Sequence, residues 1–352
     1  MDDVASERPA RPNLAAVAAL AGVSASTASL AFSGAGPVSE ATRAKVLAAA
    51  EQLNYAGPDP RAQSLRRGRS GVIGVVIEDR LSDAFRDPMN IAMLDGIADE
   101  AGAAGAALLL LTDTGAERVD IGSATMDAVI LIGCSTRLDD SVAVMRQRRI
   151  PIVAVEADHM EGVLAIGLDN RDATARIARH LRDLGHERVA VVTLPLEDSK
   201  LERELPADWE AIATSYTTRE RLRGLRDVYS SFDGIVATGS SIDAGRSAAR
   251  QILARDPRPS AIVAQSDLLA LGVIQAAEER GLVVPTDLSV VGFDGIRTDG
   301  GGGYDLTTLV QPAVAKGRAA GRAALDLLEG NPAMPVDFTS ELHLGSTTAR
   351  AL

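Results

Sequence analysis

Residues 14–55 read LAAVAALAGVSASTASLAFSGAGPVSEATRAKVLAAAEQLNY and predict three short helices. Apolar residues recur at helical spacing over 14–21, and Gly22 allows a sharp turn after them. Ser24 is a suitable N-cap for a second helix, and Ser39 is suitable for a third. The third helix has an expected apolar face made of Val46, Leu47, Ala50 and Leu53.

This arrangement is typical of a helix-turn-helix, in which the second helix enters the DNA major groove. The alternative is a small helical bundle without a ligand. Charge favours the first interpretation, because the chain has a formal net charge of −12 while residues 8–70 hold eight basic and only three acidic side chains. A basic segment before an acidic body indicates DNA binding confined to the first part of the chain.

From Gly71 onward the pattern changes to apolar runs typical of buried strands, separated by amphipathic helices. This alternation predicts parallel sheets with helices on both faces. The strands are too numerous for one small domain, so two doubly wound lobes are expected. Ligands in such folds bind at the carboxyl ends of the strands, and two facing lobes form a cleft. The expected fold class is α/β, with an all-α head and two parallel-sheet lobes.

The breaks in this pattern give the expected boundaries, with Pro58 and Pro60 ending the helical head. The expected segments are a disordered tail over 1–12, a helix-turn-helix domain over 13–60, a hinge helix or linker over 61–70, and a two-lobed domain over 71–352. Within the last domain we expect an N-terminal lobe of about 71–167 plus 297–330 and a C-terminal lobe of about 168–296 plus 331–348.

Several classes of protein are disfavoured by composition. Cys134 is the only cysteine, so neither an intrachain disulfide nor a cysteine-cluster metal site is expected, and no cofactor is predicted. Neither a secretory signal nor an uninterrupted apolar stretch long enough to span a membrane is evident, so a cytoplasmic protein is expected. Phosphate-binding, dinucleotide, zinc-protease and serine-hydrolase motifs are missing, which argues against an enzyme. The four histidines lack ligand spacing, and His186 is expected to be structural.

Six motifs together resemble the lac/galactose repressor family of bacterial transcription regulators, and the resemblance spans about residues 14–348. The motifs are ALAGVSxxT at 19–27, PVSExTR at 37–43, VLAAAExLxY at 46–55, RAQSLR at 61–66, DLLALG at 267–272 and LSVVGFD at 288–294. The resemblance implies an effector domain similar to periplasmic sugar-binding proteins, with two lobes joined by three crossings.

The resemblance also implies DNA-contacting residues at the start of the second helix, which Ser24 begins. Ala25 and Ser26 match the family's variable base-reading pair, and Thr27 and Ser29 match positions that contact phosphate or base. Leu30 stands where an arginine usually reads guanine, so the operator sequence cannot be inferred from the family. Leu30 is expected either to contact a thymine methyl group or to pack internally.

In the linker, Leu65 matches the hinge-helix leucine that pairs with its counterpart in a dimer and enters the minor groove, bending the duplex. The neighbouring Arg66 is a further expected DNA contact. The alternative for Leu65 is a linker side chain that packs on the adjacent lobe.

For the cleft, the resemblance implies that Arg221 and Asp294 bind effector hydroxyl groups, because both make paired hydrogen bonds. The alternative is a structural ion pair across the cleft. Glu156 is a weaker candidate, and Ser266 replaces an asparagine often found there. Phe85 is expected either to stack on a sugar or to be core. Asp267 is expected to cap a helix rather than bind ligand.

The sequence therefore predicts a transcription factor, most simply a repressor, that binds a near-palindromic double-stranded DNA operator as a homodimer and responds to a sugar. The chain ends without a heptad tail, which favours a dimer over a tetramer. The alternatives are a solute-binding protein of the transport type, a sugar-metabolising enzyme with a non-DNA-binding head, and a regulator whose effector is a purine or a phosphoprotein.

Overall fold

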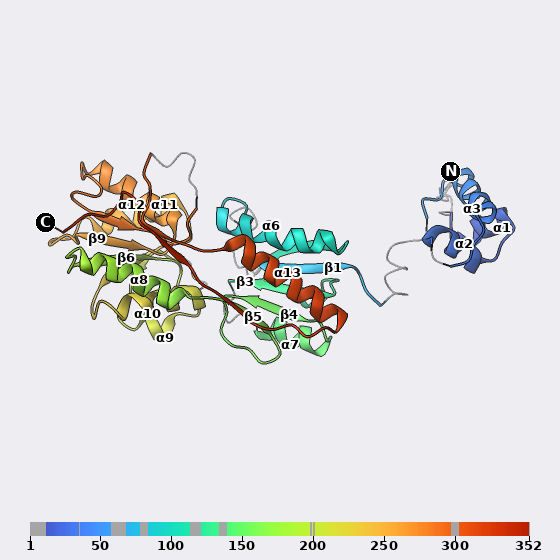
Figure 1. Ribbon diagram of the computed structural model, residues 1–352, viewed down its shortest axis with the longest axis horizontal. Helices are drawn as coiled ribbons and strands as arrows, with labels where there is room; N and C mark the ends of the chain where they lie inside the picture. Colours follow the sequence, from blue (N-terminus) through green and yellow to red (C-terminus); the bar gives the residue numbers. More distant parts are fainter. Residues whose placement is uncertain are drawn as a thin grey trace, which may run out of the picture. The chain divides into compact units, whose positions relative to one another are not determined.

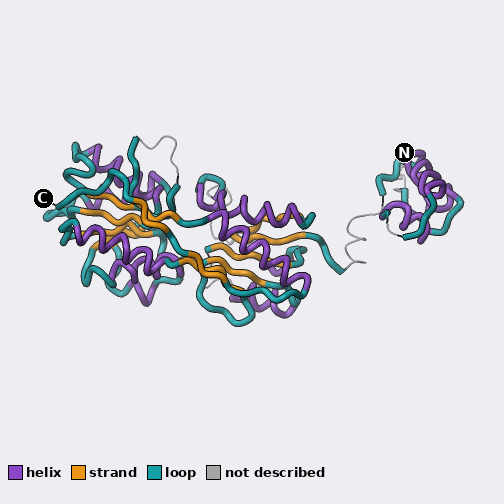
Figure 2. Tube along the Cα trace, viewed as in Figure 1, coloured by secondary structure: helices purple, strands orange, loops and turns teal. Residues whose placement is uncertain are grey.

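The computed structural model describes residues 12–34, 36–57, 68–77, 84–112, 121–133, 139–197, 199, 201–296 and 303–351 (Figures 1 and 2). The chain divides into two compact units, Met1–Ser70 and Gly71–Leu352. The expected tail over 1–12 lies almost wholly outside the described residues, as do Cys134 and most of the linker over 61–70.

The first unit contains the three expected helices, α1 (Leu14–Ala21), α2 (Ala25–Ser33) and α3 (Glu40–Gln52). Gly22 ends α1 in the left-handed conformation at φ 68°, which glycine adopts without steric cost. The axes of α1 and α2 then meet at 102°, within the range of a helix-turn-helix. The Oγ atoms of Ser24 and Ser39 accept the backbone N–H groups of Thr27 and Thr42 at 3.1 and 3.2 Å, as N-caps do.

The core of this unit is small and rich in alanine. It is formed by Val17, Ala18, Ala28, Ala31, Val46, Ala49 and Ala50. The expected apolar face of α3 is wrong at Leu47, which is 47% exposed, because the helix turns Ala49 toward the core instead. Phe32 and Tyr55 close one edge of the core in an edge-to-face contact with centroids 5.7 Å apart.

The second unit begins with a parallel six-stranded sheet in the order β12-β5-β4-β3-β1-β2. Its strands are β1 (Val72–Ile77), β2 (Ala107–Thr112), β3 (Ala128–Ile132), β4 (Ile152–Val155), β5 (Leu164–Leu168) and β12 (Val336–Phe338). Helices α6 (Pro88–Ala103) and α13 (Ala313–Glu329) cover one face, and α7 (Asp139–Gln147) with the short helix η1 (Ile121–Ser123) covers the other. This is the N-terminal lobe.

The C-terminal lobe has a five-stranded sheet in the order β10-β9-β6-β8-β7, in which only β7 is antiparallel. Its strands are β6 (Val189–Thr193), β7 (Arg203–Glu204), β8 (Asp233–Val236), β9 (Ala261–Ala264) and β10 (Ser289–Val291). One face is covered by α8 (Asn170–Asp183), α9 (Trp209–Ile212) and α10 (Tyr216–Arg226), and the other by α11 (Ile242–Ile252) and α12 (Asp267–Glu279).

Three crossings join the lobes: β5 to α8, β11 (Thr308–Val310) to α13, and β12 to β13 (Glu341–His343). The expected lobe boundaries are wrong at two places. Leu306 and Leu309 pack in the C-terminal lobe, and β12 pairs with β5 in the N-terminal lobe. The reason is that β11 pairs with β13, which keeps the chain in the C-terminal lobe until about residue 310.

Helices α6 and α13 lie side by side at unusually close range (Figure 1). A Cβ atom on Gly96 would stand 2.2 Å from the carbonyl oxygen of Val314, and one on Gly317 would stand 2.1 Å from that of Met93. Glycine at both positions therefore sets the distance between the two helix backbones. This contact fixes the place of α13, whose residue Lys316 points into the site described below.

No single helix among the described residues is long and apolar enough to cross a membrane; only the bent pair α1 and α2 reaches that length and apolarity together. In the same part of the chain, no group of three or more His, Cys, Asp or Glu side chains is placed to hold a metal ion.

Candidate DNA-binding and effector sites

The N-terminus of α2 presents a cluster of small polar side chains. The Oγ of Ser24 lies 2.8 Å from the Oγ of Ser26 and 2.8 Å from the Oγ1 of Thr27. Ser24, Ala25 and Ser26 are exposed, whereas Thr27 and Ser29 are half-buried. Exposed hydroxyl groups at a helix N-terminus suit phosphate oxygens and base edges. The expected contact residues therefore lie on one accessible end of the helix.

Leu30 has an exposed fraction of 39% and contacts the loop after α2, where a Cβ on Gly36 would meet its Cδ2 at 3.3 Å. Its side chain is thus partly packed and partly accessible, so both roles weighed from the sequence stay open. Leu65 and Arg66, the expected hinge contacts, lie outside the residues that the structure describes.

The second unit contains a cavity of about 190 Å³ between the two lobes. It lies at the carboxyl ends of β3, β4, β6, β8, β9 and β10, where ligands bind in doubly wound folds. A cavity of this size suits a small ligand. Four of the five predicted effector residues line it: Glu156, Arg221, Ser266 and Asp294.

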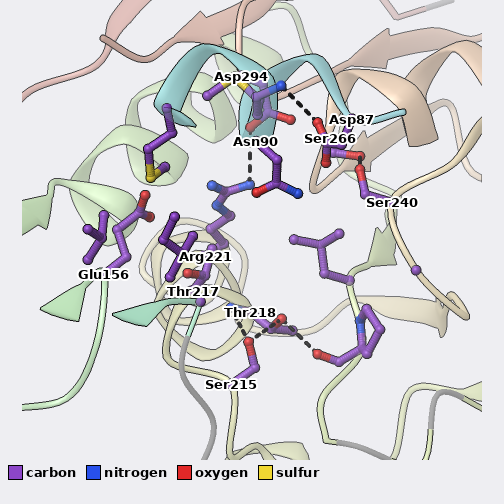
Figure 3. A pocket seen from close by; sticks show the side chains of 18 of the residues that line it. Asp87, Asn90, Glu156, Ser215, Thr217, Thr218, Arg221, Ser240, Ser266 and Asp294 are labelled. Carbon is purple, nitrogen blue, oxygen red and sulfur yellow. Dashed lines mark hydrogen bonds and ion pairs between the residues drawn. The ribbon is translucent and has the colours of Figure 1, made fainter. Parts of the chain in front are cut away.

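Arg221 lies in the middle of the cavity wall, with Asp294 on one side and Ser215 and Thr218 on the other (Figure 3). Its side chain is only 4% exposed, and its guanidinium stacks on the ring of Phe293 at 3.5 Å from the centroid. Its Nη1 atom donates to the carbonyl oxygen of Gln265 and lies 3.8 Å from the Oδ1 of Asp294. The expected ion pair exists, but both partners belong to the C-terminal lobe rather than facing each other across the cleft.

The other predicted carboxylate, Glu156, belongs to the N-terminal lobe and follows β4. Lys316 of α13 donates to its Oε1, and the Nδ2 of Asn170 donates to its Oε2 at 2.6 Å. Lys316 also donates to the Oε1 of Gln311, whose Nε2 donates to the Oδ1 of Asp294 at 2.7 Å. The Nε of Arg221 donates to the Oδ1 of Asn170 at 2.8 Å.

These contacts close into one ring of six buried side chains, which we call the polar ring. In order it runs Asp294, Gln311, Lys316, Glu156, Asn170 and Arg221, and back to Asp294. Each lobe supplies one carboxylate and one cation, and the two amides come from two of the crossings. Any change in the angle between the lobes must therefore rearrange the polar ring.

The ring environment shifts the pKa values of its charged groups. Burial raises the pKa of Asp294 well above its ordinary value, against the opposing charge of Arg221. Burial acts to raise the pKa of Glu156 too, but the charges of Lys316 and Arg221 and two hydrogen bonds outweigh it, so that pKa is lowered. Burial lowers the pKa of Arg221, while Asp294 and Glu156 act to raise it. Perturbed groups of this kind in a cleft are typical of a functional site.

Asp294 and Glu156 also share an unusual backbone, with φ values of 128° and 54°. Residues other than glycine rarely adopt positive φ, and such conformations gather at ligand-binding positions. In both lobes the chain is thus held in an uncommon conformation to point a carboxylate at the cavity.

One expectation next to the cavity, the capping role of Asp267, needs correction. Asp267 does not cap α12, because Ser266 takes the N-cap position and accepts the N–H of Leu269 at 3.2 Å. Asp267 is instead buried, accepting Thr308 Oγ1 at 2.5 Å and the N–H of Ile296 at 2.8 Å. Burial raises its pKa to about 6. The hydroxyl of Ser266 also accepts from the Oγ of Ser240 at 3.0 Å.

Phe85 is the predicted effector residue that the structure does not bring to the cavity. Its side chain is 55% exposed, and neither the cavity lining nor the described core includes it. The N-terminus of α6 lines the cavity instead, through Asp87, Met89 and Asn90. Asp87 caps that helix by accepting the N–H of Met89 at 2.9 Å, which explains why the helix begins there.

The sequence interpretation missed Lys316, Gln311 and Asn170. The sequence does carry a signal for Lys316, because this lysine lies on the same helix face as the buried small residues Ala313, Gly317 and Ala320. A charged residue at such a position requires a buried partner. The two amides follow strand ends, but nothing in the sequence identified them as members of a shared network.

An N-terminal helix-turn-helix followed by a two-lobed domain with a cleft at its strand ends defines a ligand-responsive DNA-binding protein. Residues 13–57 match the family model described as bacterial regulatory proteins of the lacI family, and residues 178–348 match the periplasmic binding protein-like domain. The HTH-type transcriptional regulator IpsA of Corynebacterium glutamicum is 31% identical, with an alignment covering 96% of this chain and 97% of IpsA.

The chain therefore belongs to the lacI family and is a DNA-binding transcriptional regulator. Two solved structures share its fold at 24% identity each. The lac repressor dimer bound to operator and the anti-inducer ONPF has a TM-score of 0.73, over 96% of this chain and 99% of that one. A complex of the transcriptional regulator CelR with cellobiose has a TM-score of 0.64, over 96% of this chain and 100% of that one.

Proposed function

We propose that this regulator is a repressor that binds a near-palindromic operator as a homodimer and that a sugar in the interlobe cavity changes its operator affinity. The observation that supports this most is the polar ring at the cavity. It joins both lobes and two crossings, so a ligand that closes or opens the cleft alters contacts in the whole second unit. The protein acts by binding and not by catalysis, as its relatives are transcriptional regulators.

On the DNA side, Ala25 and Ser26 read bases, while Ser24, Thr27 and Ser29 position the helix on phosphates. The exposure of the first turn of α2 supports this assignment. Leu30 adds an apolar contact to a thymine methyl group through its exposed part. The dimer and the operator are proposed by analogy with the lac repressor structure, and Leu65 with Arg66 would then contact the minor groove between two half-sites.

On the effector side, Arg221 and Asp294 contact ligand hydroxyls. Ser266 and, from the N-terminal lobe, Asp87 and Asn90 belong to the same cavity lining. A sugar is proposed because hydroxyl groups both donate and accept, which matches a lining of carboxylates, amides and hydroxyls. The CelR complex with cellobiose provides a precedent in the same fold.

Footprinting of the DNA upstream of the protein's own gene, at fixed salt and with a panel of sugars, tests this proposal. We expect a protected near-palindrome whose occupancy changes with one sugar. Asp294→Ala should abolish the response to that sugar and leave protection intact. Lack of protection under every condition would contradict the proposal, and a full response in Asp294→Ala would remove Asp294 from the effector site.

A further inference from the structure

An ion pair outside the cavity joins the two lobes directly. The Nη2 of Arg219, on α10 of the C-terminal lobe, donates to the Oδ1 of Asp158 at 2.5 Å. Asp158 belongs to the N-terminal lobe, in the segment after β4, and neither residue lines the cavity. In the polar ring, by contrast, the lobes are linked through Asn170 and Gln311, which belong to crossings. We call the contact of Arg219 with Asp158 the interlobe pair.

Asp158 is held firmly to the N-terminal lobe. Its neighbours Ala157 and Met160 pack against the core on the α7 face of the six-stranded sheet. The Nη2 of Arg146, on α7, donates to the carbonyl oxygen of Glu161 in the same segment. The carboxylate of Asp158 therefore moves with the N-terminal lobe.

Arg219 is held in the same way to the C-terminal lobe. Its Nη1 donates to the carbonyl oxygen of Ala213 at 3.4 Å. The carboxylate of Glu220 is farther away, at 3.7 Å, and accepts from Arg223 at 2.6 Å. The side chain of Arg219 is only 14% exposed, whereas that of Asp158 is 55% exposed. Separation of the lobes would thus return Asp158 to water and leave a largely buried guanidinium without the carboxylate that now faces it.

The interlobe pair lies next to the polar ring in both lobes. Asp158 is two residues beyond Glu156, and Arg219 is two residues before Arg221. The segment after β4 and helix α10 therefore each carry one residue of the polar ring and one of the interlobe pair. A ligand that contacts both lobes in the cavity stabilises the arrangement of the lobes in which the interlobe pair is also formed.

We infer that the interlobe pair stabilises the ligand-binding arrangement of the lobes before any ligand is present, and that Arg219 is a positioning residue for the effector response. This inference goes beyond the proposed function and rests on it for the consequences at DNA. Loss of the interlobe pair should shift the lobes toward a more open arrangement. Without effector, it should then change operator affinity in the direction opposite to the change that the effector causes.

The first test needs neither effector nor DNA. Spin labels on Ala143→Cys in α7 and Asp183→Cys in α8, both exposed, report the distance between the lobes in a full-length chain that also carries Cys134→Ser. Asp158→Arg places a like charge against Arg219, and we expect it to shift the distance distribution or to add a second population. A distribution identical to that of the unaltered pair would overturn the inference.

A charge exchange separates pairing from other effects of the substitution. The double variant Asp158→Arg, Arg219→Asp restores opposite charges and should restore the original distance distribution. Failure of this rescue, with Asp158→Arg and Arg219→Asp each shifting the distances, would contradict pairing as the cause. The control is Asp227→Arg, which breaks the pair of Asp227 with Arg171 at 2.7 Å within the C-terminal lobe and should leave the distances unchanged.

The second test measures operator affinity of the full-length chain without effector, on the DNA fragment that footprinting identifies. Asp227→Arg is again the control, because it changes the net charge by the same amount as Asp158→Arg and so corrects for general attraction to DNA. Relative to that control, we expect Asp158→Arg to change operator affinity by at least about 3-fold, opposite in direction to the effect of the sugar. A smaller change, or one in the same direction, would overturn the inference.

The inference and the proposed function can fail separately. If no DNA is protected, the proposed function is wrong, and the spin-label distances still decide whether the interlobe pair sets the arrangement of the lobes. If DNA is protected and responds to a sugar while Asp158→Arg behaves as Asp227→Arg does, the proposed function stands and the role of the interlobe pair is wrong.

Discussion

Lys316 illustrates how one buried residue links the lobes. Among the described residues it is the largest fully buried side chain. Its ammonium donates to Glu156, which follows β4, and to Gln311, which lies in the crossing from β11 to α13. A buried ion pair contributes little beyond what two apolar residues would, but removing one partner leaves a buried charge uncompensated. The role of Lys316 is therefore to fix the positions of Glu156 and Asn170 and, through them, that of Arg221.

We expect Lys316→Met to destabilise the second unit by about 3 to 5 kcal/mol at neutral pH, measured by urea denaturation. Without Lys316 the pKa of Glu156 rises, so the loss should shrink as the pH falls and Glu156 becomes neutral. The exposed Arg318, paired with Asp99 at 2.7 Å, is the matched control, and Arg318→Met should cost only about 0 to 1 kcal/mol. The double variant Lys316→Met, Glu156→Gln should be more stable than Lys316→Met alone, because it no longer buries an unpaired charge. A double variant that recovers no stability over Lys316→Met would contradict the buried pairing.

The stability contribution of Asp267 should depend on pH in the opposite direction to that of the Lys316–Glu156 pair. Its pKa in the folded protein is raised to about 6 from 3.8, so its favourable contribution is complete below about 3.8 and is lost as the pH rises through 6. Asp267→Asn removes that loss and should gain stability relative to wild type between pH 4 and pH 8, by at most roughly 3 kcal/mol. Thermal melts at the two pH values measure it, with the exposed Asp208→Asn as control. A stability difference that did not change with pH would show that Asp267 does not titrate in this range.

Most of the site residues could be predicted from the sequence because they follow strands with clear apolar patterns. Glu156 and Asp294 were found that way, with the family resemblance. Arg221 lies within α10 and was found from the family resemblance alone. The partners that define their chemistry could not be predicted, because Gln311 and Lys316 come from a segment far along the chain that returns to the first lobe. Phe85 was misplaced because an aromatic residue beside a strand gives no indication of which way it points.

At the scale of elements, the long helices and central strands follow their sequence patterns, while the crossings do not. β5, β11, β12 and β13 are short, and their pairing joins residues far apart in sequence, which a local pattern cannot reveal. The lobe boundary was consequently wrong near residues 304–310 and 336–338. The contact of α6 with α13 depends instead on a local feature, the glycines that let two backbones approach.

Gly317→Ala should push α13 away from α6, because its Cβ would stand 2.1 Å from the carbonyl oxygen of Met93. We expect a loss of about 1 to 3 kcal/mol in chemical denaturation, together with weaker effector binding, since Lys316 is the adjacent residue. Gly102→Ala in α6 is the control, because nothing lies within 4 Å of its added Cβ and alanine favours helix by up to about 1 kcal/mol. Equal stability of both variants would mean that the close approach of the helices is not required.

At the scale of the whole molecule, we propose that ligand binding in the cavity of the second unit is coupled to DNA binding by the first. Such coupling is a free energy shared by two sites, so it acts in both directions. A sugar that weakens operator binding by some factor must itself bind the operator complex more weakly by the same factor. The polar ring supplies the element in the second unit that a ligand can bias, because its members come from both lobes.

The most direct test is the affinity of the full-length protein for its effector, measured by titration at fixed salt with and without saturating operator DNA. We expect operator DNA to change effector affinity by about 5- to 150-fold, which is the same factor by which the effector changes operator affinity, and we expect Asp294→Ala to remove this effect. An effector that binds free and operator-bound protein equally well would contradict this coupling, because the cavity and the DNA-binding head would then act independently.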